Sequence, residues 1–251
     1  MIGDPEGTVL AMFAAFCRVG ACFMLLPGLG TLRVPMMIRL FVSVAVSFSI
    51  LPILWDAIYP QVSEGGPGYI GIVGVELLIG TVIGLLARYY VLALQFAGSV
   101  ISMLIGFNAM PGVGIDEMES QTSLSAMLSF VGLLILFMLD YHHIVIVSLT
   151  NSYDVMPLGL AFDSQLALVS LTDTLLASFT LILQLSAPFI IYGLAFNLAV
   201  GMVNKLAPQI PVYFISIPFL LAGGLILLYL GSNDFFRLFG RGFEPIFTGT
   251  Q

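Results

Sequence analysis

The stretch that decides the fold runs from Tyr69 to Gly106 and reads YIGIVGVELLIGTVIGLLARYYVLALQFAGSVISMLIG. Its charged residues are Glu76 and Arg88 alone. A helix needs about 20 predominantly apolar residues to cross the hydrocarbon core of a bilayer, which is about 30 Å thick. This stretch is longer than one straight crossing requires. It therefore predicts a membrane helix that is bent, broken or extended beyond the hydrocarbon.

Apolar blocks of the same kind recur along the rest of the chain. They cover residues 8–27, 35–55, 122–152, 166–203 and 210–231. The 251 residues are 59% hydrophobic and 8% charged, with a mean hydropathy of +1.10, whereas an average soluble domain is about 25% charged. The sequence predicts an all-α, multi-pass membrane protein. We expect residues 1–251 to form a single domain without a soluble appendage.

The three longest blocks need break points, which glycine, proline or polar residues can supply. Proline inside a helix removes a hydrogen bond and clashes with the preceding turn. The candidate break points are Gly98, Asp140 with His142 and His143, and Ala187-Pro188.

The charge distribution narrows the possible functions. Fourteen acids and seven bases give a net charge of −7, which leaves no basic stripe for nucleic-acid phosphates. Arg33 and Arg39 follow the first block, but Arg237 and Arg241 would lie on the opposite side of the membrane if six simple crossings were counted. The positive-inside rule therefore does not describe a plain six-helix permease here.

Several charged residues lie inside or at the ends of the apolar blocks: Arg18, Glu76, Arg88, Asp140 and Lys205. A charge at the centre of a membrane helix costs at least about 2.5 to 3.5 kcal/mol on insertion scales, so such groups need partners or water. They could form ion pairs between helices or subunits, or an ion relay along a transport path. Pairing is favoured because six of the seven bases are arginine, whose planar guanidinium suits fixed bidentate contacts.

Catalytic and metal-binding patterns are weak in this sequence. Cys17 and Cys22 would point about 140° apart on a helix, and His142 and His143 about 100° apart. Neither pair therefore predicts a disulfide or a metal site. We find no glycine-rich phosphate-binding loop and no Ser/His/Asp arrangement that would indicate catalysis. The sequence predicts a protein that is not an enzyme and needs no metal or cofactor.

Gly80 and Gly84 form the motif GTVIG. Two small residues four apart let membrane helices approach closely. The motif predicts tight packing of this block against another helix, in this chain or in a partner.

The segment from Gly106 to Gln121 combines glycine, proline, methionine and phenylalanine with an acidic end. Irregular apolar backbone between membrane blocks is tolerated only where it is buried in protein or lines a watery cavity. The segment could be a re-entrant or plugging loop, or an apolar surface turn.

Motifs at four places along the chain form a recognisable series. The first comprises Arg18-Val19-Gly20, Pro27, Gly30, Val34-Pro35 and Arg39, and the second comprises Glu76, Gly80, Gly84, Ala97-Gly98 and Gly106. The third comprises Asp140-Tyr141-His142, Ser152-Tyr153 and Pro157-Leu158-Gly159. The fourth comprises Gly201, Asn204-Lys205, Ala207-Pro208-Gln209, Val212-Tyr213-Phe214, Pro218 and Gly223-Gly224. Over nearly its whole length the chain resembles the FliR family of flagellar biosynthesis proteins and its type III secretion counterparts.

The chain departs from that family pattern at a few places. Tyr141 stands where glycine is usual, Lys205 where arginine is common and Met103 where glutamine is frequent, and the usual Asp-Pro of the central loop is absent.

The resemblance implies an architecture and a location that periodicity alone does not give. Such proteins are helical hairpins that join FliP-like and FliQ-like subunits in a helical pore, next to an FlhB-like subunit. This gate lies in the flagellar basal body of the bacterial inner membrane and projects toward the periplasm. The resemblance thus implies one FliR-like export-gate domain over residues 1–251 that conducts unfolded flagellar proteins and makes or breaks no bond.

The resemblance also implies roles for individual residues. The plug of a closed resting channel would include Gly106, Phe107, Met110, Pro111, Gly112, Gly114 and Ile115. Structural charges or subunit contacts would include Arg18, Arg39, Glu76, Arg88, Lys205 and Gln209.

Three alternatives remain open at this point. The same gate role in a virulence injectisome shares all the motifs. A stand-alone secondary transporter would use Glu76, Arg88 and Asp140 as an ion relay. A scaffold without a conducting path would also satisfy the composition.

Overall fold

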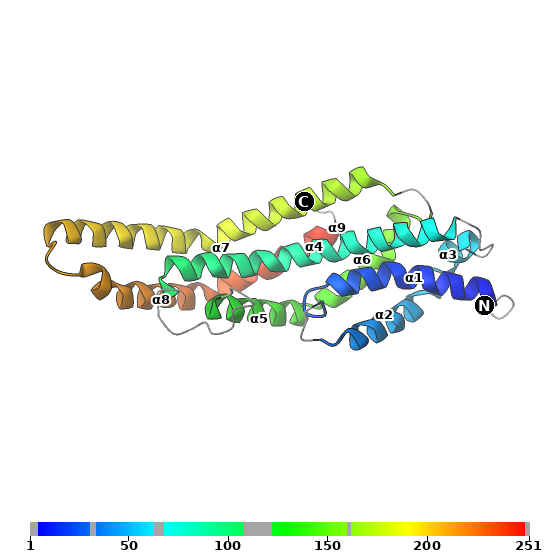
Figure 1. The fold of residues 1–251 in the computed structure, drawn as a ribbon, viewed down its shortest axis with the longest axis horizontal. Helices are drawn as coiled ribbons and strands as arrows, with labels where there is room; N and C mark the ends of the chain where they lie inside the picture. Colours follow the sequence, from blue (N-terminus) through cyan, green and yellow to red (C-terminus); the bar gives the residue numbers. More distant parts are fainter. Residues whose placement is uncertain (1–4, 31–33, 63–67, 108–121, 160–161, 249–251) are drawn as a thin grey trace. The chain divides into compact units, whose positions relative to one another are not determined.

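The computed structural model describes residues 5–30, 34–62, 68–107, 122–159 and 162–248. Over these residues the chain is helical and contains no strand (Figure 1). The helices are α1 (Pro5–Leu25), α2 (Met36–Ile50), α3 (Trp55–Val62), α4 (Tyr69–Leu104), α5 (Ser123–Met138), α6 (Tyr141–Val155), α7 (Ser164–Leu206), α8 (Val212–Arg241) and α9 (Glu244–Thr248). The predicted all-α class is confirmed.

Four stretches of the described chain are long and apolar enough to cross a membrane: α1, α4, α7 and residues Val212–Phe247. The number rises to six if α2 with α3, and α5 with α6, each form one bent span. α2 and α3 meet at 101°, close to Pro52, which cannot continue the hydrogen-bond ladder of a helix. The multi-pass character predicted from composition is therefore confirmed.

The predicted break at Asp140 is correct, whereas neither Gly98 nor Ala187-Pro188 ends a helix. Asp140 has a φ of 55° and lies between α5 and α6, a left-handed conformation that ends a right-handed helix. α4 runs without interruption through Gly98, and α7 runs through Pro188. Gly98 lies where α5 approaches closely, since a Cβ there would be 3.0 Å from the Cα of Ser125. A single hydrogen bond lost at Pro188 does not end so long an apolar helix.

The chain forms two compact units with four boundaries between them, of which two fall inside α4 and α7, one lies between α5 and α6 and one between α8 and α9. Unit 1 comprises residues 1–90, 140–176 and 243–251, and unit 2 comprises residues 91–139 and 177–242.

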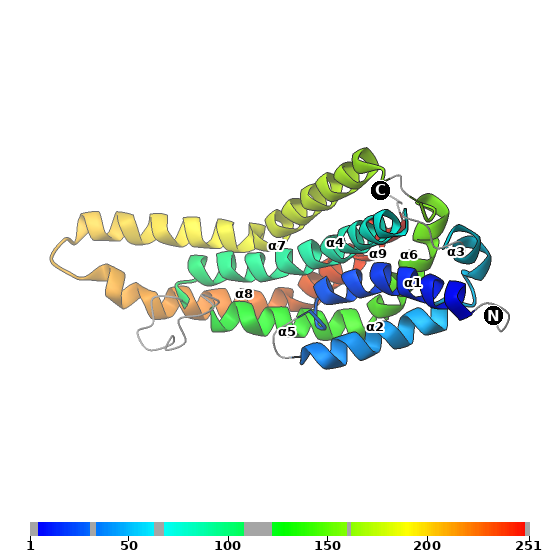
Figure 2. The same cartoon turned by 45° about the vertical axis from the view of Figure 1, so that its right-hand side comes forward.

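Unit 1 is built around α1, which packs against α2 and α3 (Figures 1 and 2). Alanines on the inner face of α1, including Ala11 and Ala14, are fully buried against Ile58 of α3. Small side chains on this face allow neighbouring helices to approach closely. The hydroxyl of Tyr69 in α4 donates to the carbonyl oxygen of Leu10 at 2.8 Å.

Unit 2 packs α5 against α8. A Cβ at Gly132 in α5 would overlap the side chain of Leu94, and a Cβ at Gly224 in α8 would overlap that of Ile105. Between α7 and α8, the hydroxyl of Tyr192 donates to the carbonyl oxygen of Leu220 at 2.9 Å. Helices in this unit therefore approach closely where side chains are smallest.

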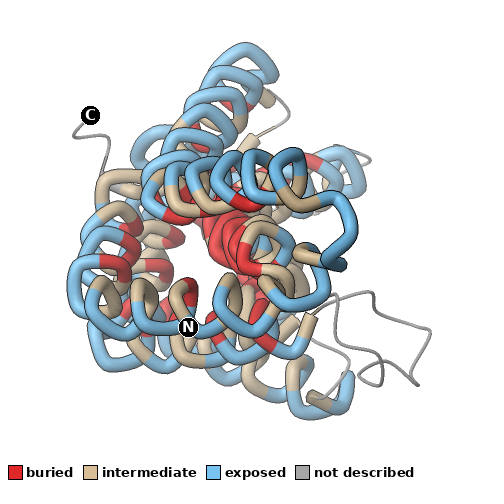
Figure 3. The backbone as a smooth tube through the Cα atoms, turned by 90° about the vertical axis from the view of Figure 1, so that its left-hand side faces the viewer, coloured by how far each residue is buried: buried red, intermediate tan, exposed pale blue. Residues whose placement is uncertain are grey.

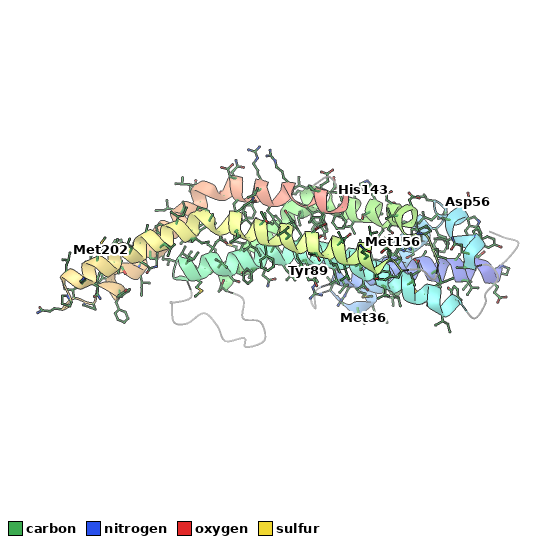
Figure 4. All side chains as sticks on the ribbon, turned by 90° about the horizontal axis from the view of Figure 1, so that it is seen from above. Met36, Asp56, Tyr89, His143, Met156 and Met202 are labelled. Atoms are coloured by element: carbon green, nitrogen blue, oxygen red, sulfur yellow. The ribbon has the colours of Figure 1, made fainter. Side chains whose placement is uncertain are left out.

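Large apolar side chains remain exposed on both units. In Figure 3, exposed positions cover most of the outward-facing turns of the helices. Met36 in unit 1 and Met202 in unit 2 are labelled in Figure 4 and are 68% and 57% exposed. Leu206, Phe214 and Tyr229 of unit 2 are also exposed. Apolar surface of this extent requires lipid or other protein to cover it.

Candidate functional site

A buried ion pair joins α1 to α4 in unit 1. Arg18 and Glu76 are both fully buried, and they lie 58 residues apart in the chain. The Nε of Arg18 donates to one carboxylate oxygen of Glu76, and one terminal guanidinium nitrogen donates to the other, each at 2.7 Å. This bidentate geometry is the strongest form of the contact, because two parallel charge-assisted hydrogen bonds form at once.

α6 completes the surroundings of this pair. The other terminal nitrogen of Arg18 donates to the hydroxyl of Ser152 at 2.9 Å. The terminal nitrogen that contacts Glu76 also donates to the carbonyl oxygen of Met156, at 3.1 Å. The guanidinium carbon lies 3.7 Å from the ring centroid of Tyr153, whose hydroxyl donates to Glu76 at 3.3 Å. We call Arg18, Glu76, Ser152, Tyr153 and Met156 the arginine cluster. It ties α1, α4 and α6 together.

Gly80 and Gly84 lie on α4 where α1 crosses it. A Cβ at Gly80 would overlap the backbone carbonyl of Arg18 and come within 3.0 Å of Ala21. A Cβ at Gly84 would be 2.9 Å from the carbonyl oxygen of Cys22. The helix that packs on GTVIG is therefore α1 of the same chain. Glu76 lies one helical turn before Gly80 on α4. The close approach of the two helices at Gly80 therefore lets the side chain of Arg18 reach Glu76.

Replacing Gly80 by alanine should destabilise unit 1 by about 1–3 kcal/mol, because the added methyl group meets backbone atoms that have little room to move. The measurement is the melting temperature of the purified protein in its assembly. Gly74→Ala is the matched control, since a Cβ at that position of α4 has no atom within 4 Å. An equal melting temperature for both variants would contradict the close-packing argument.

A cavity of about 370 Å³ in unit 1 borders the arginine cluster. Ser152 and Met156 line it together with apolar residues of α4, including Ile79 and Ile83. Arg18 and Glu76 themselves have no exposed surface. An ion relay needs groups that exchange protons with water or with one another. The closed bidentate geometry of this pair is better suited to holding helices in place.

The remaining candidate contact residues are not part of the arginine cluster. Arg39 is half-buried on α2, and its Nε donates to the carbonyl oxygen of Val34 at 3.2 Å. Arg88 is exposed on α4. Lys205 is exposed in the last turn of α7, and Gln209 is exposed between α7 and α8.

The cysteines and histidines form no metal site in the described part of the chain. Cys17 and Cys22 are buried with free thiols. Nε2 of His142 lies 3.9 Å from a carboxylate oxygen of Asp140.

Most of the expected plug lies outside the described residues. Met110, Pro111, Gly112, Gly114 and Ile115 belong to that part of the chain. Gly106 and Phe107 are described, and Gly106 has a φ of 75°, a conformation that glycine adopts without strain. A Cβ at Gly106 would be 3.3 Å from the side chain of Leu220.

Sequence reasoning missed a group of hydroxyl side chains between α4 and α5 in unit 2. Ser102 and Ser125 are fully buried, and the Oγ of Ser102 lies 2.7 Å from the Oγ1 of Thr122. Ser99-x-x-Ser102 and Thr122-x-x-Ser125 could have signalled it, because a three-residue spacing places two side chains on one face of a helix.

Comparison with known proteins places these features in a family. Residues 9–246 match the model of the bacterial export proteins, family 1. The chain is 34% identical to the flagellar biosynthetic protein FliR of Caulobacter vibrioides, over 87% of this chain and 86% of that protein. It is 26% identical to the FliR of Aquifex aeolicus, over 93% of this chain and 94% of that protein.

A relative from another kind of secretion system also matches. The secretion system apparatus protein SsaT of Salmonella typhimurium is 30% identical, over 94% of this chain and 96% of that protein. The match of the family model and the three sequence identities above agree with the apolar helices and with the resemblance seen in the motifs. The chain belongs to the FliR family of bacterial export proteins and is a membrane-embedded subunit of a type III export apparatus.

Proposed function

We propose that the protein is the R subunit of a flagellar type III export gate in the bacterial inner membrane and basal body. In this proposal, FliP-like and FliQ-like subunits complete a channel with it, an FlhB-like subunit adjoins it, and unfolded flagellar proteins pass through. The exposed apolar side chains of α7 and α8 carry the proposal, because they need a covering that the described residues do not supply. The two units would act together as one export-gate domain that projects toward the periplasm.

The charged residues and Gln209 divide into two roles in this proposal. Arg18 and Glu76 hold α1 and α4 together inside the subunit. Arg39, Arg88, Lys205 and Gln209 contact neighbouring subunits. Three of these four side chains are exposed, and long polar side chains at the edge of an apolar surface fix the orientation of a partner.

The plug is the third element of the proposal. Gly106, Phe107, Met110, Pro111, Gly112, Gly114 and Ile115 would close the resting channel. Apolar side chains in a narrow pore exclude water and thereby ions. Transport needs no bond chemistry, which suits a subunit whose family is a structural component of the export apparatus.

A second candidate is the same role in a virulence injectisome. It is favoured by the 30% identity to SsaT. Expression of the protein in a flagellar mutant and in an injectisome mutant, each lacking its own R subunit, distinguishes the two. Restored motility supports the flagellar proposal, and restored effector secretion alone supports the injectisome.

Expression with partners tests the gate proposal directly. Produced alone, the protein should give little monodisperse material in detergent, and production with its FliP-like and FliQ-like subunits should raise the yield and the particle size. Binding that buries apolar surface stabilises the folded chain by mass action. A long-lived, monodisperse monomer that transports a solute in liposomes would instead support a stand-alone transporter.

A further inference from the structure

A groove of about 200 Å³ lies between α7 and α8 in unit 2. Most of its lining is leucine and phenylalanine, including Phe189 of α7 and Phe235 of α8. Gly231 of α8 also lines it, and a Cβ at this position would have no atom within 4 Å. The space is therefore open where Gly231 carries no side chain, and we call it the Gly231 groove.

The size of the Gly231 groove suits side chains of another helix better than a small molecule. Pockets that bind small ligands usually enclose about 300–1,000 Å³, whereas this groove encloses about 200 Å³. Leu183 of α7 and Leu230 of α8 are next to lining residues in the sequence, and both are exposed. A helix that covered this apolar surface would place side chains in the groove, because ridges on one helix pack into grooves on another.

Two residues that line the groove carry hydrogen-bond acceptors without a donor. Pro188 has no N–H, so the carbonyl oxygen of Gln184, four residues earlier in α7, lacks its usual helical donor. Asp234 of α8 is exposed, and within the described residues it forms no ion pair or hydrogen bond. Asp234 also belongs to the candidate membrane span Val212–Phe247. Polar groups in such a span need a donor or water.

The nearby basic residues of α8 do not supply this donor. Arg237 and Arg241 are exposed, and neither of them lines the groove. The groove thus combines an apolar floor with the carboxylate of Asp234. Lipid tails could cover the floor, but they have no hydrogen-bond donor for the carboxylate. An apolar helix that carries a lysine or an arginine matches both parts.

We propose that the Gly231 groove receives a helix of a neighbouring gate subunit, which places a large apolar side chain against Gly231 and a basic side chain beside Asp234. Charge complementarity of this kind fixes the orientation of a partner. The inference rests on the proposed gate function, in which partner subunits cover the apolar faces of α7 and α8. It adds the place of one contact and the chemistry of the helix that fits it.

Filling the groove tests whether a partner occupies it. Gly231→Leu adds a side chain at a position where the protein itself has room, because a Cβ there has no atom within 4 Å. We expect the yield of complex with FliP-like and FliQ-like subunits to fall about ten-fold, since the added side chain displaces one from the centre of an interface. Gly74→Leu on α4 is the matched control, because a Cβ at that position also has no atom within 4 Å. Assembly of Gly231→Leu at the level of this control would overturn the proposal.

Replacement of Asp234 tests for the basic side chain. Asp234→Leu should lower the yield of complex several-fold, and Asp234→Asn should lower it less, because an amide oxygen still accepts a hydrogen bond. Asn233→Leu is the control on the same turn of α8, since Asn233 is exposed and does not line the groove. Equal yields for Asp234→Leu and Asn233→Leu would show that no basic side chain of a partner faces the carboxylate.

Cross-linking identifies the occupant without filling the groove, so it decides the question even if Gly231→Leu does not fold. A photo-crosslinking amino acid replaces Leu238, which lines the groove, and mass spectrometry identifies what it captures in the assembled gate. A cross-link to a partner helix, within one turn of a lysine or an arginine, supports the proposal. A cross-link to phospholipid alone, or no cross-link, would overturn it.

The failures of the two proposals are distinguishable. If the unaltered chain assembles with its partners and Gly231→Leu assembles equally well, the groove proposal is wrong and the gate proposal stands. If the unaltered chain is a stable monomer that does not bind FliP-like and FliQ-like subunits, the gate proposal is wrong and the groove proposal falls with it.

Discussion

Replacement of Arg18 by methionine should abolish assembly of the protein. The change leaves the Glu76 carboxylate fully buried without its cation, and loss of one partner of a buried pair costs about 3–5 kcal/mol. The hydrogen bonds to Ser152 and Met156 and the contact with the Tyr153 ring disappear with it. The yield of assembled complex and its melting temperature measure the effect. Arg18→Lys keeps the charge but not the bidentate geometry, so it should retain part of the assembly.

The double variant Arg18→Met with Glu76→Met tests whether assembly requires the two charges themselves or only requires that neither charge is buried without the other. Replacement of a buried ion pair by apolar side chains is often neutral or stabilising by about 1–4 kcal/mol. The double variant should therefore assemble better than either single variant, and it should export. If the double variant assembles fully but export no longer depends on the proton-motive force, the pair belongs to a relay and the structural assignment is wrong.

The sequence predicted the two charged residues of the arginine cluster but not their contact. A charged residue inside an apolar block needs a partner or water. Arg18 and Glu76 were both identified as such residues from the sequence. The sequence could not predict that these two residues pair with each other, because 58 residues separate them and the contact depends on how α1 crosses α4. Gly80 and Gly84 indicated a close crossing, but small residues do not name the helix that approaches them.

Helix boundaries show a similar limit. Asp140 was identified as a break because a charged residue interrupts a long apolar run. Gly98 was not a break, since its missing side chain makes room for Ser125, and composition alone does not separate these two uses of glycine. The last apolar block was expected to end at Gly231, but α8 continues to Arg241. Polar residues such as Asn233 and Asp234 end the hydrophobic pattern without ending the helix, since both are exposed.

The group of hydroxyl side chains between α4 and α5 was missed because serine and threonine carry little hydrophobic signal. Their role depends on which residue faces them across the helix interface, and Ser102 and Thr122 belong to different apolar blocks. A search for three-residue spacing on both blocks finds the candidate positions. It does not predict that Ser102 and Ser125 are fully buried, because burial follows from the packing of α5 against α4 at Gly98.

Deletion of residues 108–117 from the assembled gate should make the membrane leak ions while assembly and some export continue. The proposed seal is apolar, with Phe107, Met110 and Ile115 against the pore wall, and a dry constriction blocks ions by excluding water. Asp116, Glu117 and Glu119 would face water, since burial of three unpaired carboxylates is too costly. The deletion removes most of this seal and leaves both α4 and α5 intact.

The measurement is small-ion leakage, seen as a depolarised membrane and slowed growth, with the yield of assembled gate recorded in parallel. Gly112→Pro with Gly114→Pro is a useful companion variant. It keeps the length of the segment but removes the freedom that glycine gives the backbone, so it should slow export without a leak, because a stiff plug still seals. A deletion that assembles normally and stays ion-tight would show that the segment is a surface turn, and the channel must then be closed by apolar side chains elsewhere in the assembly.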